Sequence, residues 1–291
     1  ASLALFANKL TTGVVVNVGF GATFVVPVVA GHILRPAIRM LHLSGMDLTQ
    51  KMAELLDATG HELNWRPEMG GRPIAAITVV RNLKERALEV FPTSLRDRLG
   101  VANLRSYRSW IERTDAPLKR VELGEVPFII GWERFACAEV LFGDGSGDPE
   151  CTLQCGIMKA VEAATTLLED PASLDESVAS AAASLGRLGD GSDAIRRTML
   201  RSIVLSGGSA AIAGLPERLG SEIRQLYESE KGWTPEELRV YPAHESDATP
   251  WRGAQVLAGT STFSEHWCVH SLPDGPEGDC DSVRARICRI S

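Results

Sequence analysis

The sequence lacks an apolar run long enough to cross a membrane. The longest candidate, Val14 to Val29, is interrupted by Asn17 and by residues typical of turns, whereas a membrane-spanning helix needs about 18 or more consecutive apolar residues. The first ten residues carry no basic lead, so we expect no secretory signal peptide. The chain also has no initiator Met, so we expect it to begin partway through a longer gene product.

Long blocks of one charge are also absent. The 30 Lys and Arg residues and the 37 Asp and Glu residues leave a net charge of −7, which argues against a nonspecific nucleic-acid binder. Cysteine is scarce, with 6 in 291 residues, which does not fit a disulfide framework. Cys151 and Cys155 are spaced as C-x₃-C with no nearby His or second pair. We therefore expect reduced, intracellular thiols rather than a metal site.

The most informative stretch is a β-rich run that breaks at Gly19 and Gly21 and then resumes. It predicts two strands within residues 12–30, joined by a tight glycine turn. A second apolar strand, residues 203–205, precedes Gly207 and Gly208. Two such turns predict two β-hairpins whose glycine turns bind a phosphate between them. The turn of the first hairpin has no carboxylate, although phosphate chemistry with a metal ion would need one.

Hydrophobic periodicity and turn residues divide the rest of the chain into elements. With 44% hydrophobic residues in 291, the chain suits one large or two smaller globular domains. Helices are predicted at 50–58 (with Asp47 or Thr49 as N-cap), 77–91, 153–168, 215–226 and 254–260. Strands are predicted at 35–43, 126–130 and 238–241. Loop or irregular structure is predicted at 60–75, 92–124 and 143–152, an insertion around a weak helix at 169–194, and a polar tail at 273–291.

Blocks spread from residue 1 to about residue 270 resemble actin, and they occur in the same order. Residues 11–21, Thr-Thr-Gly-Val-Val-Val-Asn-Val-Gly-Phe-Gly, resemble its second phosphate hairpin. The other blocks with counterparts in actin are Leu-Ser-Gly-Met-Asp-Leu-Thr (43–49), Val-Arg-Asn-Leu-Lys-Glu-Arg (80–86), Glu-Arg-Phe-Ala-Cys-Ala-Glu-Val-Leu-Phe (133–142), Val-Leu-Ser-Gly-Gly-Ser (204–209) and Trp-Arg-Gly-Ala-Gln-Val-Leu-Ala-Gly-Thr-Ser-Thr-Phe (251–263).

The resemblance implies an α/β, actin-like (ribonuclease-H-like) fold with a mixed sheet flanked by helices. The large-lobe core would comprise residues 1–45 and 132–238, with an insertion at about 143–194. Residues 46–131 would form an inserted helical subdomain, residues 239–272 would return to the small lobe, and residues 273–291 would be a tail. The front lobe and the first phosphate loop would lie upstream of Ala1.

The same resemblance implies a nucleotide cleft. Gly19 and Gly21 match the turn glycines of the phosphate hairpin, and three positions match those that face the ribose and base: Gly45, Lys84 and Glu85. The adenosine-side turn is matched by Gly207, Gly208 and Ser209. ATP or ADP could then be a structural ligand. The alternative interpretation is that the glycines serve only turn geometry and that Lys84 and Glu85 are an ordinary pair on a helix surface.

The departures from actin concern the chemistry of hydrolysis. Asn17, Val18 and Phe20 replace an Asp, a Ser and a second Asp. An amide accepts a hydrogen bond but supplies no charge, and a phenyl ring supplies neither. Other differences near the nucleotide are Phe24, Met46, Ala211, Ile212 and Asp247. We therefore expect no dedicated metal site and ATPase activity that is absent or very weak.

The subtype that the sequence most resembles is the plant and algal actin-related protein that carries an F-box. This implies a non-polymerising interaction or scaffold module that recruits a target to a ubiquitin ligase, in the nucleus or nucleolus and the cytoplasm, without direct contact to nucleic acid or membrane. One alternative is a subunit of a nuclear chromatin-remodelling complex. Another is an ATP-binding, cytoskeletal actin-like protein that forms filaments.

Overall fold

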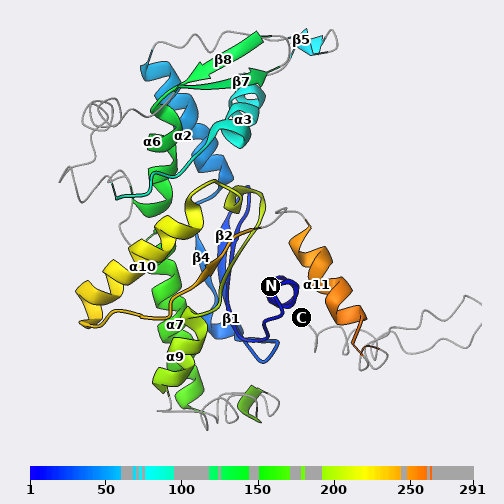
Figure 1. Cartoon of the computed structure of the whole chain (residues 1–291), viewed down its shortest axis with the longest axis vertical. Coiled ribbons are helices and arrows are strands. Elements are labelled where there is room, and N and C mark those ends of the chain that lie inside the picture. Colours follow the sequence, from blue (N-terminus) through cyan, green and yellow to red (C-terminus); the bar gives the residue numbers. More distant parts are fainter. Residues whose placement is uncertain are drawn as a thin grey trace, which may run out of the picture.

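A mixed β-sheet lies at the centre of the computed structural model (Figure 1). The structure describes residues 1–59, 68–69, 72–73, 76–94, 118–123, 126–143, 151–170, 178–180, 192–243, 248–260 and 263. The central sheet has 6 strands in the order β10-β9-β1-β2-β3, with β4 also paired to β2. Its strands are β1 (Gly13–Val18), β2 (Thr23–Val29), β3 (His32–Ile33), β4 (Arg39–Leu41), β9 (Ile203–Ser206) and β10 (Val240–Tyr241).

The β1–β2 hairpin fixes the register of this sheet. The two strands are antiparallel, with Val15 opposite Val26 and Asn17 opposite Phe24. On its other side β1 runs parallel to β9, so the carboxyl ends of both strands reach the same edge, with Asn17 beside Ser206. The β-branched residues of β1 and β2 favour extended backbone and are almost all buried. The predicted glycine-turn hairpin is confirmed.

Helices cover both faces of the sheet. One face is packed by α7 (Leu153–Glu169), α9 (Ser192–Leu200) and α10 (Leu215–Lys231), which share the larger hydrophobic core with the sheet. On the other face α1 (Ser2–Ala7) packs against α11 (Thr249–Ala258), and a smaller core joins Leu5 to Val15 and Val204. This arrangement confirms the expected mixed sheet flanked by helices.

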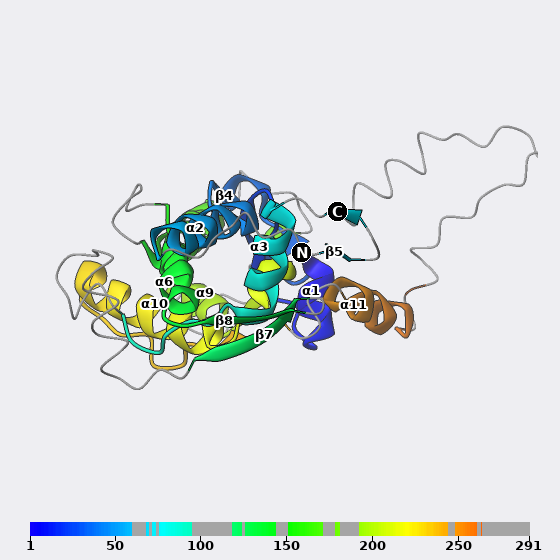
Figure 2. The ribbon, with the colours of Figure 1, turned by 90° about the horizontal axis from the view of Figure 1, so that it is seen from above.

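A second group of elements gathers at one end of the sheet, as Figure 2 shows from above. It contains α2 (Gly45–Ala58), α3 (Ala76–Ala87), α6 (Glu133–Ala138) and the antiparallel pair β7 (Lys119–Leu123) and β8 (Val126–Ile130). The short 3₁₀ segment η2 (Glu139–Phe142) follows α6 directly, and a small ladder pairs β5 (Glu68–Met69) with β6 (Arg72–Pro73). Helix α2 packs against both α3 and α6, and its first turn is hydrogen-bonded to the turn between β1 and β2.

Several local predictions were wrong. Helix α2 begins at Gly45 and is capped by Ser44, whose Oγ accepts a hydrogen bond from Met46 N–H at 3.3 Å; the prediction of a start at residue 50 followed only the apolar stripe. The turn after β9 does not close a second β-hairpin, because it leads through the 3₁₀ segment η4 (Gly208–Ala210) into α10. Residues 35–43 contain the 3₁₀ segment η1 (Arg35–Ala37) before the short β4.

Two predicted irregular stretches contain strands. β7 lies within residues 92–124, and β5 and β6 lie within residues 60–75. These strands are short or have polar faces, which hides the two-residue alternation. The predictions for the middle of the 169–194 insertion, for most of the 143–152 loop, for Asp247 and for the 273–291 tail fall outside the described residues.

Candidate functional site

A cavity of about 560 Å³ lies between α3, the start of α2 and the turn that follows β9. It brings together Lys84 and Glu85 from α3 with Gly208 and Ser209 from η4, four of the positions that the sequence singled out. The remaining side chains that line it are Phe20, Leu48, Arg81, Leu88, Ala211 and Ile212. We call it the base-side cavity, after the part of a nucleotide that the matched positions would face.

The turn of the hairpin is joined directly to the first turn of α2. Gly45 N–H donates to Gly19 C=O at 2.9 Å, and Met46 N–H donates to Phe20 C=O at 2.8 Å. Two of the amide groups that a helix leaves unpaired at its start are therefore occupied by the chain itself. Gly45 must lack a side chain, because a Cβ there would collide with Ser209 Oγ and would lie 3.3 Å from Phe20 Cα.

The turn after β9 depends on a second glycine. Gly207 has φ of +91°, and a Cβ there would lie 2.5 Å from Val18 C=O and 2.6 Å from Asn17 Oδ1. The absence of a side chain lets this turn close onto the end of β1. Gly208 and Gly21 differ, because an added Cβ would meet nothing within 4 Å at either position. Gly21 does not line the base-side cavity.

Lys84 is part of the wall rather than of the surface. Its side chain is 5% exposed and its Nζ donates to Gly45 C=O at 2.8 Å. Desolvation lowers the pKa of the Lys84 ammonium, and the negative charge of Glu85 opposes that shift. The alternative interpretation, an ordinary pair of Lys84 and Glu85 on the helix surface, does not hold for Lys84, which is buried. Glu85 is half exposed and pairs with Arg81, whose Nε lies 2.9 Å from Glu85 Oε1.

Phe20 forms the hairpin side of the base-side cavity. The ring is 48% exposed, and the guanidinium carbon of Arg81 lies 5.0 Å from its centroid, which is a cation–π contact. Sequence reasoning placed Phe20 against phosphate and metal but missed its stacking with Arg81. An arginine four residues before Glu85 could have predicted the ion pair but not the ring beneath it.

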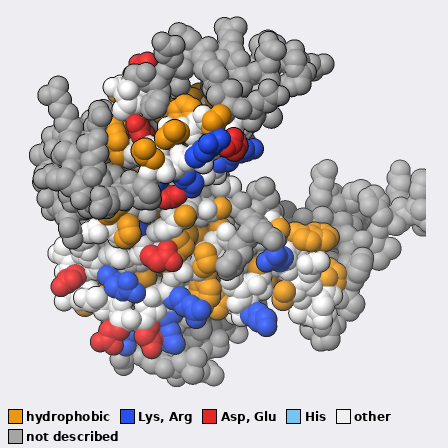
Figure 3. Space-filling model, turned by 45° about the horizontal axis from the view of Figure 1, so that its top comes forward, with side chains coloured by type: hydrophobic (Ala, Val, Ile, Leu, Met, Phe, Trp, Pro, Cys, Tyr) orange, Lys and Arg blue, Asp and Glu red, His pale blue; other side chains and the backbone are white. Residues whose placement is uncertain are grey.

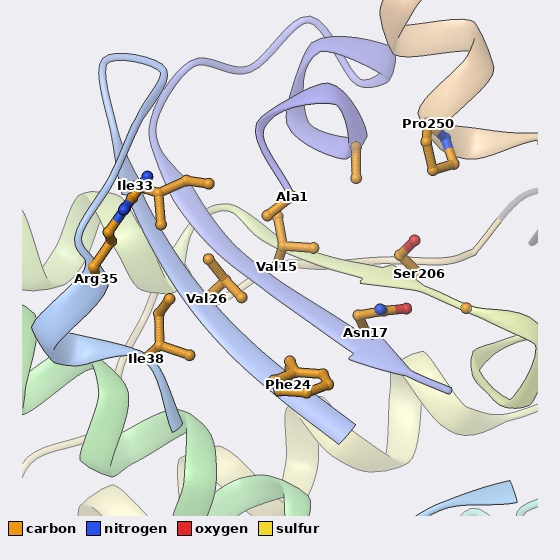
Figure 4. Close-up of a pocket in the computed structure, with 12 residues that line it drawn as sticks. Ala1, Val15, Asn17, Phe24, Val26, Ile33, Arg35, Ile38, Ser206 and Pro250 are labelled. Carbon is orange, nitrogen blue, oxygen red and sulfur yellow. The ribbon is translucent and has the colours of Figure 1, made fainter. Parts of the chain in front are cut away.

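A second cavity, of about 700 Å³, lies on the sheet face beside α1 (Figure 4). Asn17, Phe24 and Ser206 project into it from three adjacent strands, and Val15, Val26, Ile33 and Ile38 make most of the lining apolar. We call it the sheet-face cavity. Its other lining residues are Ala1, Ala4, Arg35, Gly207 and Pro250.

The residues at the end of the hairpin do not fit the hydrated magnesium ion that the resemblance implies. Magnesium in phosphate sites is held through carboxylates, and the matching positions supply the amide of Asn17, the isopropyl group of Val18 and the ring of Phe20. Across the described part of the chain, no group of three or more His, Cys, Asp or Glu residues is placed to hold a metal ion. Cys151 and Cys155 lie at the start of α7, which Thr152 caps.

Sequence reasoning also missed a buried ion cluster that joins α10 to η2 and to the segment that follows α3. Arg218 of α10 is 1% exposed and makes two hydrogen bonds to Glu139, at 2.9 and 3.0 Å, and one to Glu222, at 2.7 Å. Its guanidinium also donates to the carbonyls of Phe91 and Thr93, which follow α3. The only signal in the sequence was a charge at the start of an apolar helix face.

The face of the molecule that Figure 3 shows has no dominant charge over its described residues. The face in Figure 3 mixes basic, acidic and hydrophobic side chains over its described residues, with no continuous patch of one sign. Within the described ranges, no helix combines the length and the hydropathy that a bilayer span requires. The exposed large apolar side chains include Phe20, Phe24, Met40 and Met46, all close to the hairpin or to the start of α2.

Comparison with known proteins gives the family. "Actin-related protein 8" of Oryza sativa subsp. indica is 30% identical over 269 residues, which cover 92% of this chain and 45% of that protein. "Actin-related protein 2" of Saccharomyces cerevisiae is 31% identical over 229 residues (78% and 47%), and "Centractin" of Schizosaccharomyces pombe is 27% identical over 266 (90% and 56%). The chain thus spans about half the length of the curated relatives it matches. Residues 1–271 match the actin family model, and the chain belongs to the actin family.

Proposed function

We propose that this chain is an interaction or scaffold module of an actin-related protein whose nucleotide cleft does not hydrolyse ATP. The observation that carries the proposal is the replacement of the metal-site acids by Asn17 and Phe20, at the end of a hairpin whose backbone geometry is intact. Hydrolysis in this kind of cleft needs a metal ion to neutralise the developing charge and polar groups to orient the attacking water.

The cleft keeps a structural use in this proposal. The base-side cavity has the size of a small-molecule site, and it retains Lys84, Glu85, Gly208 and Ser209. ATP or ADP bound there would stabilise the folded chain by mass action without being consumed. Binding without turnover distinguishes a nucleotide-stabilised scaffold from a working ATPase.

The expected partners are proteins. An F-box relationship would make the chain the target-recruiting part of a ubiquitin-ligase subunit, in the nucleus or nucleolus and the cytoplasm. The exposed side chains Phe20, Phe24, Met40 and Met46 support protein contact, because methionine and aromatic residues adapt well to a partner surface. Actin-like filaments are not expected.

Phosphate release from the longest native form of the protein tests the absence of hydrolysis. We expect release from Mg-ATP at the level of the buffer control. Release above that background that disappears in Glu85→Gln would overturn the proposal. The matched control is Glu217→Gln, which makes the same chemical change on α10 at a residue that lines neither cavity.

Affinity purification of the same protein from its source tests the proposed role as an interaction module. Ubiquitin-ligase subunits among the partners would support target recruitment. A helicase-family partner would select the chromatin-remodelling alternative instead. Sedimentation with ATP and salt would reveal filaments, and a pellet that depends on ATP would contradict the non-polymerising proposal.

A further inference from the structure

The sheet-face cavity combines an apolar floor with polar groups at its two ends. The floor is aliphatic, with Val15, Val26, Ile33 and Ile38 facing the same space (Figure 4). Its volume of about 700 Å³ lies in the range of small-molecule sites. None of the residues that line it also lines the base-side cavity, so a ligand here is distinct from one in the base-side cavity.

One end of the cavity carries two uncharged polar side chains. Ser206 is only 5% exposed, and its side chain projects into the cavity beside that of Asn17 (Figure 4). Neither side chain forms a hydrogen bond with another residue that the structure describes. A hydroxyl that is buried to this degree is normally hydrogen-bonded. This end therefore has an open position for a neutral polar group of a ligand, such as a hydroxyl.

The opposite end carries the charge of the cavity. Arg35 of η1 is exposed, and among the described lining residues it is the one with a charged side chain (Figure 4). Its guanidinium forms no ion pair or hydrogen bond with another described side chain. A guanidinium binds a carboxylate through two parallel hydrogen bonds. One positive charge balances one carboxylate, whereas a phosphate monoester would leave a second negative charge beside the apolar floor.

The register of the sheet gives the distance between the two ends. Asn17 lies opposite Phe24, and Ile33, two residues before Arg35, lies opposite Val28. Phe24 and Val28 are four residues apart on β2, which corresponds to about 13 Å and to a saturated chain of about ten carbons. Aliphatic side chains line the space between the ends, so a flexible alkyl chain suits it better than a polar ligand.

We infer that the sheet-face cavity binds a medium-chain aliphatic carboxylic acid. Its carboxylate pairs with Arg35, its alkyl chain lies on the valine and isoleucine floor, and a hydroxyl at the far end of the chain meets Ser206 and Asn17. The inference goes beyond the proposed function, because it requires neither a nucleotide nor a protein partner.

Calorimetric titration of the longest native form of the protein tests the ligand class. Hexanoate, octanoate, decanoate and dodecanoate are each titrated below the concentration at which they form micelles. We expect the affinity to rise about threefold for each added methylene up to decanoate, and by less than about twofold in total beyond it. A rise that continues through dodecanoate would indicate unspecific partitioning and overturn the inference, as would no binding of any of the four.

Removal of the charge at Arg35 tests the carboxylate contact. We expect the unaltered protein to bind octanoate at least about tenfold more tightly than octanol, and Arg35→Met to abolish this preference by weakening octanoate alone. The matched control is Arg197→Met, because Arg197 is exposed and lines a different cavity. Equal losses in the two variants would assign the preference to the general charge of the surface and contradict the contact.

A variant at the other end tests the hydroxyl contact. Ser206→Ala is expected to weaken ω-hydroxydecanoate about fivefold and decanoate by less than about twofold. The retained binding of decanoate shows that the variant still folds. The control is Ser221→Ala, at an exposed position on α10, which should change neither affinity. An equal loss of both ligands in Ser206→Ala, or a loss of neither, would contradict this contact.

Competition with nucleotide separates this inference from the proposed function. Because the two cavities share no lining residue, saturating Mg-ATP should change the affinity for decanoate by less than about twofold. Displacement of decanoate by Mg-ATP would assign the sheet-face cavity to the nucleotide cleft. That result would overturn this inference and leave the proposed interaction module standing.

Discussion

The two cavities at the end of the β1–β2 hairpin share a frame but differ in chemistry. The base-side cavity is lined by three charged side chains, those of Arg81, Lys84 and Glu85, whereas the sheet-face cavity has the charged side chain of Arg35 in a lining that is otherwise apolar or uncharged. Gly45 and Gly207 hold the backbone around both of them through contacts that a side chain would block. The difference teaches that one backbone frame can support two neighbouring cavities of unlike chemistry.

The largest expected effect comes from the buried ion cluster around Arg218, which lines neither cavity. Arg218→Met removes a buried guanidinium that binds Glu139 and the carbonyls after α3. It removes the guanidinium that pairs with the buried Glu139 carboxylate and with Glu222, which should destabilise the protein by about 3–5 kcal/mol. Chemical denaturation measures this. Arg201→Met is the control: Arg201 is 58% exposed in its ion pair with Glu237, and its loss should cost less than about 1 kcal/mol.

The next effect concerns the frame that both cavities share. Gly207→Ala adds a Cβ that would lie 2.5 Å from Val18 C=O at a φ of +91°, so the turn must shift, and we expect a loss of about 2–3 kcal/mol. Gly208→Ala, one residue later, adds a Cβ into open space and should change stability by less than about 0.5 kcal/mol. Similar melting temperatures for the two variants would refute the assigned contact.

A smaller effect separates the two interpretations of Lys84. Lys84→Met keeps the length of the side chain but removes the donor to Gly45 C=O, which should cost about 1–2 kcal/mol. Lys231→Met, at the end of α10 and exposed, should cost only a few tenths of a kcal/mol. If the two variants unfold at the same denaturant concentration, the hydrogen bond from Lys84 to Gly45 C=O contributes no measurable stability.

The smallest effect tests the stack on Phe20. Arg81→Ala removes a cation–π contact at 5.0 Å and an ion pair whose side chains are about half exposed, so we expect a loss of about 0.5–1 kcal/mol. Added salt should shrink the part that comes from Glu85. The measurement is the melting temperature of Arg81→Ala and of the unaltered protein at low and high salt; equal shifts at both would assign the whole effect to the ring.

The sequence was sufficient for the parts of the fold that depend on local patterns. The β1–β2 hairpin followed from β-branched residues on either side of Gly19 and Gly21, and α7 and α10 followed from their apolar spacing. It was not sufficient where a choice depends on distant contacts. The start of α2 at Gly45 is decided by the carbonyls of the hairpin turn, which a helix pattern does not contain.

The same limit applies to the candidate site. Lys84, Glu85, Gly208 and Ser209 could be named in advance because they lie in blocks that resemble actin, and the structure brings them to one cavity. Their contacts could not be predicted in this way. The bond from Lys84 to Gly45 joins residues 39 positions apart, and the ring of Phe20 meets Arg81 only because α2 and α3 pack together.

Gly45 has a consequence for how the cleft opens. Its N–H is bound to the hairpin turn, its C=O accepts both Lys84 Nζ and Thr49 Oγ1 at 2.8 Å, and its bare Cα makes room for Ser209. Separating any one of these segments strains the contacts to the others. The hairpin turn, the start of α2, α3 and the turn after β9 should therefore open as one unit. The exchange of this single amide hydrogen with solvent deuterium would then report the opening of the whole cleft.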